Sequence, residues 1–217
     1  MDGRTPGTMV IYLLDKPGAA QSAIRAGHVG APRHNPDYFA LGLLNHLFGG
    51  QFTARLNMNL REDKGYSYGY RSWIEWHRQS SLLMAGGGVQ TDVTREAVQE
   101  TLREFQDIGG DRPVTEAEFE VAKAALLRQI PSSFETSWQI LEELIQLVSF
   151  DLPDDYNSTL AAEIEAVSLE DIRRVAREHI INDRLMMLVV GDRDVVEPSL
   201  REIGLPLYLV DQEGREV

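Results

Sequence analysis

The stretch LREDKGYSYGYRSW, residues 60–73, joins a charged helix end to a run rich in tyrosine. Phe52, Leu56 and Leu60 stand at positions i, i+4 and i+8, which is the spacing of one apolar helix face. Gly65 favours the end of this helix, because glycine readily adopts the left-handed conformation that follows a helix C-terminus. The stretch therefore predicts a helix that ends abruptly at residue 65.

The residues after this break alternate in the manner of a β-strand. Tyrosines occupy every second position at the start of the predicted strand, namely Tyr66, Tyr68 and Tyr70. Strict alternation places all three on one face of the strand. Arg61 and Tyr68 then stand seven residues apart across the joint, and the break in the helix allows the two side chains to point to one place.

Strands and helices follow in groups along the rest of the chain. Apolar or alternating runs bounded by turn residues predict further strands at 10–14, 21–29, 80–90, 185–190 and 207–210. Amphipathic runs and capping signals predict helices at about 37–48, 94–108, 115–129, 135–149, 154–167, 169–180 and 196–203. This order favours the α+β class, with a mostly antiparallel five- to six-stranded sheet and helices packed on one face. Residues 1–9 are interpreted as a polar linker, and residues 10–217 as a single domain.

Composition excludes several classes of function. The chain has 217 residues, of which 43% are hydrophobic and 25% charged, as in ordinary globular proteins. No apolar run is long enough to span a membrane. The net charge of −13 opposes binding to nucleic acid. The absence of cysteine excludes thiol nucleophiles and cysteine zinc sites, but it leaves the compartment open between bacterial cytoplasm and periplasm, and no signal peptide is predicted.

Two segments come close to a zinc-hydrolase motif without completing it. The pattern H-x-x-E-H puts two histidine ligands and a catalytic glutamate on one helix face. Residues 175–179 keep the final Glu-His pair but have Val175 in place of the first ligand. Residues 42–46 keep only His46 and have Asn45 where the glutamate belongs. We predict no metal site in this chain, and expect a solvated Glu178-His179 helix end and a His46 bonded by backbone groups.

The segment from Gly49 to Ser72, GGQFTARLNMNLREDKGYSYGYRS, resembles a signature of the pitrilysin, insulin-degrading enzyme and mitochondrial processing peptidase family. The family pattern in the C-terminal half is approximately LGG-(small/polar)-x-SRL…LR-(E/T)-x-x-G-x-(A/S)-Y. The preceding turn and strand, around DKPGAAQ at residues 15–21, are similar to the opening of that half. The resemblance covers about 10–210. One departure is Ala54, where many members carry serine.

The resemblance implies a half-enzyme. Members of the family close two homologous α+β halves around an unfolded peptide. One half carries H-x-x-E-H and binds the zinc, whereas the other has lost its ligands and supplies an arginine and a tyrosine seven residues apart. Arg61 and Tyr68 match that pair, and residues 42–46 fall where the lost zinc motif would be. The expected partners are an HxxEH-containing half, in the same polypeptide or a separate subunit, and the peptide substrate.

The chemistry of the two side chains agrees with these roles. Peptide hydrolysis places negative charge on a carbonyl oxygen, and a phenol such as Tyr68 can donate a hydrogen bond to it. Arg61 is permanently charged and can donate to backbone carbonyls of an extended peptide. Tyr66 and Tyr70, on the face assigned to Tyr68, are expected to line the same chamber, with packing against the sheet as the alternative.

Two other interpretations remain at the level of sequence. Arg61 in a last helical turn can serve the helix dipole alone, and Tyr68 can serve sheet packing alone. The chain would then be a catalytically inactive scaffold or a peptide-binding subunit with the same fold.

Overall fold

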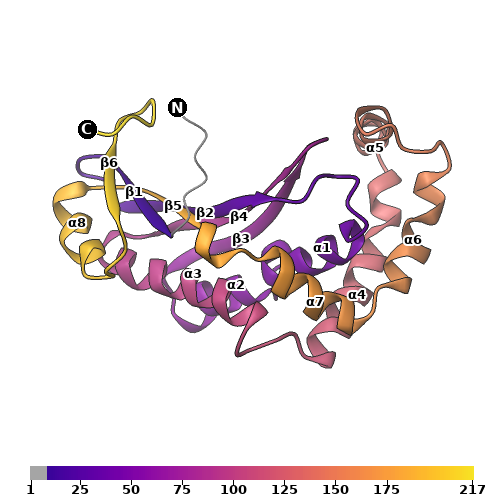
Figure 1. The fold of residues 1–217 in the computed structure, drawn as a ribbon, viewed down its shortest axis with the longest axis horizontal. Coiled ribbons are helices and arrows are strands. Elements are labelled where there is room, and N and C mark those ends of the chain that lie inside the picture. The colour runs from indigo at the N-terminus through magenta and orange to yellow at the C-terminus, as the bar shows by residue number, and fades with distance from the viewer. Residues whose placement is uncertain (1–8) are drawn as a thin grey trace.

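The computed structural model describes residues 9–217, so the predicted linker at 1–9 lies almost wholly outside the described residues. The described residues form a six-stranded sheet in the order β3-β4-β2-β5-β1-β6 (Figure 1). Its strands are β1 (Val10–Asp15), β2 (Gln21–Gly30), β3 (Ser67–Trp76), β4 (Ser81–Gln90), β5 (Met186–Gly191) and β6 (Leu207–Val210). β3, β4, β2 and β5 are antiparallel neighbours, whereas β5, β1 and β6 run parallel.

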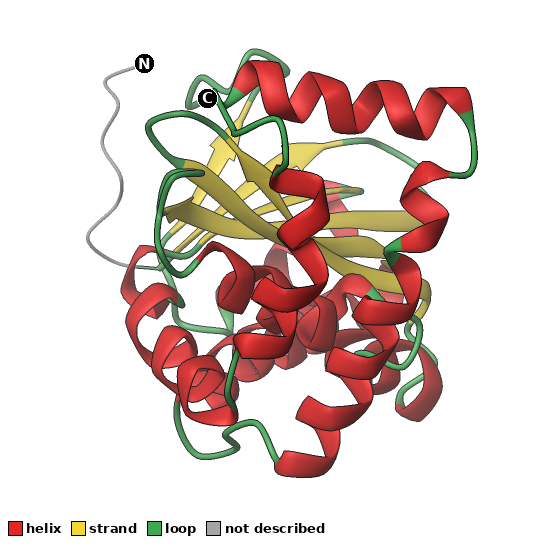
Figure 2. Ribbon diagram, turned by 90° about the vertical axis from the view of Figure 1, so that its right-hand side faces the viewer, coloured by secondary structure: helices red, strands yellow, loops and turns green. Residues whose placement is uncertain are grey.

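Helices cover one face of this sheet. The α-helices are α1 (Tyr38–Asn45), α2 (Arg55–Asn57), α3 (Thr94–Gly109), α4 (Glu116–Gln129), α5 (Ser137–Ser149), α6 (Tyr156–Ala166), α7 (Leu169–His179) and α8 (Arg193–Arg201). In Figure 1, α1, α2, α3 and α7 lie below the sheet, and Figure 2 shows this layer from the side with α5 above the strands. The predicted α+β class with a layer of helices on one face is confirmed, and α5 lies outside that layer. Within the described part of the chain, no helix is long and apolar enough to cross a membrane.

The core lies between the sheet and this helical layer. Residues of β2 alternate between buried and exposed, as a strand with one covered face requires. Phe48 and Phe105 meet edge to face beneath the sheet, with ring centroids 4.9 Å apart. Both rings are almost completely buried, which contributes roughly 1.5–3 kcal/mol for each side chain.

The β3 edge of the sheet is covered by the segment that follows α1. His46–Gly50 forms a π-helical turn, and Gly49 lies directly against the backbone of Ser72 in β3. A Cβ at position 49 would overlap the Ser72 nitrogen, so only glycine permits this contact.

We predict opposite effects for two glycine-to-alanine substitutions in this region. Gly49→Ala should destabilise the fold by about 1–3 kcal/mol, because the new methyl group forces β3 and the π-helical turn apart. Gly42→Ala is the matched control, since Gly42 lies in α1 and nothing lies within 4 Å of its added Cβ. Helix propensity predicts that Gly42→Ala stabilises by up to about 1 kcal/mol. Urea unfolding of both variants measures the difference, and equal effects would contradict this account.

Candidate functional site

The helix-to-strand joint is built around Gly65. α2 continues into a π-helical segment, Met58–Asp63, and Gly65 then adopts a φ of 67°. The Gly65 amide donates to the Arg61 carbonyl at 3.1 Å, and the Tyr66 amide donates to the Leu60 carbonyl at 2.9 Å. These bonds use carbonyls that the helix end leaves without partners. The predicted helix end at Gly65 is therefore confirmed, although Phe52 lies before the helix.

A β-bulge changes the face on which Tyr68 lies. Ser67 pairs with Val89 and Tyr70 pairs with Gly87, so β3 has one residue more than β4 between these pairs. The Ser67 hydroxyl stabilises the bulge by accepting from the Gly69 amide at 3.1 Å. A bulge of this kind redirects the side chains next to it, and bulges are frequent beside active sites.

The expectation that Tyr70 lines a peptide chamber is wrong. Tyr70 is 0% exposed, and its hydroxyl accepts a hydrogen bond from Thr101 in α3 at 2.8 Å. Burial raises the pKa of Tyr70 far above its ordinary value. Tyr68 is 86% exposed, so the bulge separates two tyrosines that strict alternation placed together. Tyr66 is half-buried and packs against the core, which is the packing alternative for that residue.

Arg61 and Tyr68 both lie on the surface near the joint. The Arg61 guanidinium stands over the Phe52 ring at 4.7 Å and approaches Glu62 at 3.3 Å. Its side chain is 38% exposed, and the pair with Glu62 is a weak surface contact. Within residues 9–217, the Tyr68 hydroxyl has no hydrogen-bond partner among the side-chain bonds of the structure. Both polar ends are accessible to a peptide.

Asn57 connects the elements on both sides of the joint. Its side chain is buried, its Nδ2 donates to the Phe52 carbonyl at 2.8 Å, and its Oδ1 accepts from the Tyr70 amide at 3.1 Å. The Asn57 side chain therefore fixes both Phe52, whose ring contacts Arg61, and the backbone of β3 at Tyr70. The sequence alone gave no signal for this role.

The helix that resembles a zinc motif cannot hold the metal. Gly42 offers no side chain, and Asn45 Oδ1 accepts from the Ser72 hydroxyl at 2.7 Å. His46 is buried, and burial lowers its pKa. Its Nε2 has no hydrogen-bond partner in the described structure, contrary to the expectation that backbone groups satisfy it. One imidazole without a second ligand beside it does not fit zinc.

A second cluster contains residue types that can bind a metal, but its side chains form an ion-pair network. Asp37, Glu178 and His179 bring one ligand atom each within 4.8 Å of one another. Arg174 donates to Asp37 at 2.6 Å and to Glu178 at 3.0 Å, so a guanidinium already supplies the positive charge. His179 Nε2 lies 3.0 Å from Asp37, so this histidine is packed against a carboxylate, whereas Glu178 is exposed as expected for a solvated helix end. The Arg174 hydrogen bonds hold the pKa of Asp37 at about 2.

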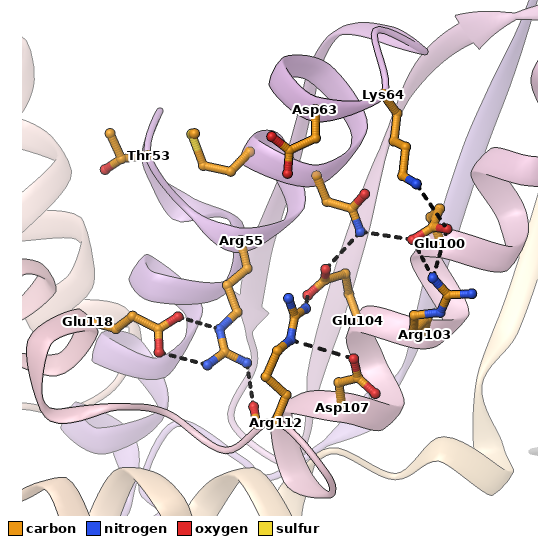
Figure 3. A pocket seen from close by; sticks show the side chains of 12 residues that line it. Thr53, Arg55, Asp63, Lys64, Glu100, Arg103, Glu104, Asp107, Arg112 and Glu118 are labelled. Atoms are coloured by element: carbon orange, nitrogen blue, oxygen red, sulfur yellow. Dashed lines mark hydrogen bonds and ion pairs between the residues drawn. The ribbon is translucent and has the colours of Figure 1, made fainter.

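A hollow of about 400 Å³ lies between the joint segment and α3, and its lining is charged (Figure 3). Arg55 lies deep in this lining, with a side chain that is only 7% exposed. It donates to both oxygens of Glu118, at 2.7 and 2.8 Å, and to the carbonyls of Arg112 and Pro113. Arg61 and Tyr68 do not line this hollow.

Two buried carboxylates of α3 hold the middle of the joint segment. Asn59 Nδ2 donates to Glu100 at 3.0 Å and to Glu104 at 2.8 Å. Arg112 pairs with Glu104, and Arg103 pairs with Glu100. The acidic and basic side chains that line the hollow neutralise one another. The hollow therefore holds the joint segment in place and is not a ligand site. In the sequence, Arg55 stands out only as part of the family pattern, and Glu118 only as the partner of Thr115 in a helix capping box.

The geometry defines an α+β domain with a layer of helices on one face of a mixed sheet, in which residues 42–46 offer one histidine and no second zinc ligand. A family model described as the Peptidase M16 inactive domain matches residues 4–126. This is more than half of the chain, and the chain belongs to that family.

Relatives in bacteria carry related names. The chain is 26% identical over 180 residues to the "Uncharacterized zinc protease YmxG" of Bacillus subtilis, covering 82% of this chain and 43% of that protein. It is 28% identical over 162 residues to the "Probable inactive metalloprotease YmfF" of the same organism, covering 74% and 37%. The crystal structure of a peptidase M16 inactive domain from Pseudomonas fluorescens has a TM-score of 0.76 at 22% identity, over 85% of this chain and 44% of that chain. The chain spans less than half the length of these relatives, and the structural likeness shows the fold.

The Arg55–Glu118 pair predicts a defined loss of stability in acid. Hydrogen bonds from Arg55 and Thr115 outweigh desolvation and lower the pKa of Glu118 from 4.5 to about 2. A lowered folded-state pKa stabilises the fold above pH 4.5, and this contribution disappears as the pH falls from 4.5 towards 2. Glu118→Gln should cost roughly 2–3 kcal/mol at pH 7, less than for a fully buried pair because Glu118 is partly exposed.

The measurement is chemical unfolding of the parent and Glu118→Gln proteins from pH 7 to pH 2. The difference between them should shrink through the acid window. Glu116→Gln, at an exposed position on the same helix, is the control and should leave the pH profile unchanged. A constant difference across the whole range would show that Glu118 does not carry this pH dependence.

Proposed function

We propose that this chain is the metal-free half of a zinc endopeptidase and supplies Tyr68 and Arg61 to an active site shared with an HxxEH-bearing half. The zinc is held by that other half, in the same polypeptide or in a second subunit. The observation that carries the proposal is the exposure of both side chains next to a bulged strand, in a domain of the M16 inactive family. By itself the chain is inactive.

Tyr68 is proposed to stabilise the charge that develops on the scissile carbonyl oxygen. A phenol donates one hydrogen bond, which is stronger for an oxyanion than for the neutral ground state. The bulge holds Tyr68 away from the core. In the core its hydroxyl would already form an internal hydrogen bond, as the Tyr70 hydroxyl does with Thr101. Its role therefore depends on the local backbone geometry of β3.

Arg61 is proposed to hold the peptide in register. Its guanidinium rests against the Phe52 ring, which limits its conformational freedom and leaves its N–H groups for backbone carbonyls of an extended substrate. Tyr66, which is half-buried beside the joint, is proposed only as a wall of the peptide path. Tyr70 has no part in it.

The alternative is a catalytically inactive scaffold or peptide-binding subunit. The name of the Bacillus subtilis relative described as a probable inactive metalloprotease favours it. Under this alternative, an assembly that contains the chain and a zinc-bearing half would bind extended peptides without turning them over.

Removing the phenol hydroxyl should lower turnover with little effect on binding. In the full protein or complex that contains this chain, Tyr68→Phe should reduce kcat on the order of 10²–10³-fold at nearly constant KM, because the lost bond forms in the transition state. Tyr208→Phe, an exposed tyrosine on the opposite edge strand β6, is the matched control. Zinc content should be the same in all three proteins, and undiminished kcat in Tyr68→Phe would refute the catalytic role.

Removing the guanidinium should act mainly on substrate binding. Arg61→Ala should raise KM about 10- to 100-fold with a smaller effect on kcat, as expected for lost charge-assisted hydrogen bonds. Arg177→Ala is the control, because Arg177 has only a surface pair with Glu170. Steady-state kinetics on an unstructured peptide separates the two constants. An effect on kcat alone would argue against peptide positioning.

A further inference from the structure

Helix α5 exposes a stripe of large apolar side chains. None of its residues is buried. Its large exposed apolar residues are Trp138, Ile140, Leu141, Leu144, Ile145 and Val148. Val148 is 77% exposed and Trp138 is 67% exposed. An amphipathic helix normally turns such a stripe towards a core, and a contiguous exposed patch marks an interaction surface.

The position of α5 explains why its own chain does not cover the stripe. Figures 1 and 2 show α5 above the level of the sheet, on the side opposite the helical layer that contains α3 and α7. Within the described residues, its main packing partner is the short 3₁₀ turn Pro131–Phe134. The Trp138 indole donates at 2.9 Å to Glu142 of α5 itself. The helix is folded, but its apolar side faces outward.

The segment around α5 has one sign of charge. Residues 129–172 contain ten acidic residues and no lysine, arginine or histidine. Three of the ten pair with arginines from elsewhere in the chain: Asp151 with Arg78, Glu170 with Arg177 and Asp171 with Arg174. Glu142 and Glu143 lie on α5 itself. A surface that covers the stripe must therefore be apolar in the middle and tolerate acidic neighbours at its rim. Lysine and arginine around an apolar patch meet both requirements.

The negative charge of this segment distinguishes between three candidate partners, which are a membrane, a second copy of this chain and a different protein. Interfacial membrane helices carry lysine and arginine on their polar face, and an acidic segment is repelled by anionic headgroups. A second copy of this chain brings another net charge of −13, which opposes self-association through the acidic segment. A different protein surface with a basic rim is the occupant that the charge favours.

We propose that α5, with the acidic segment 129–172, is a docking surface for the zinc-bearing half, which contacts it through an apolar patch rimmed by lysine and arginine. This rests on the proposed function. More than half of each Bacillus subtilis relative lies outside the part that matches this chain, which leaves room for a second domain of similar size.

The test uses single cysteines, because the chain has none of its own. Leu144→Cys places a thiol in the stripe, where the native side chain is 51% exposed. Val195→Cys is the matched control on α8, where the native side chain is 53% exposed. Both are prepared in the full protein or complex, and maleimide labelling of each position is followed by peptide mass spectrometry.

Leu144→Cys should react roughly tenfold or more slowly than Val195→Cys, because labelling requires α5 to leave the covering surface. Glu142→Lys should speed labelling at position 144 by weakening the rim contacts. Unfolding midpoints should be unchanged, since both sites are exposed within the chain itself.

Equal labelling rates of the two cysteines, in an assembly that contains the zinc-bearing half, would overturn the docking surface. If Tyr68→Phe also lowers kcat in that assembly, the proposed function still stands. If no zinc-bearing half is present and Tyr68→Phe is neutral, the proposed function fails, and this occupant fails with it. Protection that depends on the concentration of the isolated chain would identify a second copy. Protection only by added phosphatidylcholine vesicles would identify a membrane. Either result overturns the proposal.

Discussion

The polar clamp on residues 55–63 is the constraint on which the candidate site depends. Arg55, Asn57 and Asn59 stand two residues apart, and each of their side chains bonds to a different neighbour: Glu118, the start of β3, and the two acids of α3. The Asn57 and Arg55 side chains are buried, so each would lose its solvation without these partners. The clamp therefore specifies one position for the segment that carries Arg61.

A clamp made of polar groups is suited to a π-helical segment. Regular helices are held by their own i to i−4 bonds, whereas Met58–Asp63 has the wider π-helical turn, which is rare and less stable. Outside partners then compensate for the weaker internal bonding. The same logic applies to the bulge in β3, where the Ser67 hydroxyl and the Asn57 amide occupy groups that a regular ladder would have paired. Both irregularities lie next to the proposed catalytic pair.

Sequence reasoning succeeded where a local rule decides the structure. Gly65 was predicted as a helix end, and its φ of 67° follows from the conformational freedom of glycine. Reasoning failed for Tyr70, because a bulge is one inserted residue that only the pairing of Ser67 and Tyr70 with β4 reveals. It also gave no role for Glu100 and Glu104, because the residue that they hold, Asn59, is more than 40 residues away in sequence. Non-local pairing was the missing information in each case.

The end of α1 is joined to β3 by contacts that involve no metal. Asn45, in the position of a catalytic glutamate, accepts a hydrogen bond from Ser72 and so joins α1 to β3. Gly49 then brings the following turn into contact with the same residue. Restoring a ligand set would need a histidine at 42 and a glutamate at 45, and a charged carboxylate at 45 would disturb a partly buried contact that holds the edge strand. The end of α1 and the turn after it thus support β3, the strand that carries Tyr68, through Asn45 and Gly49.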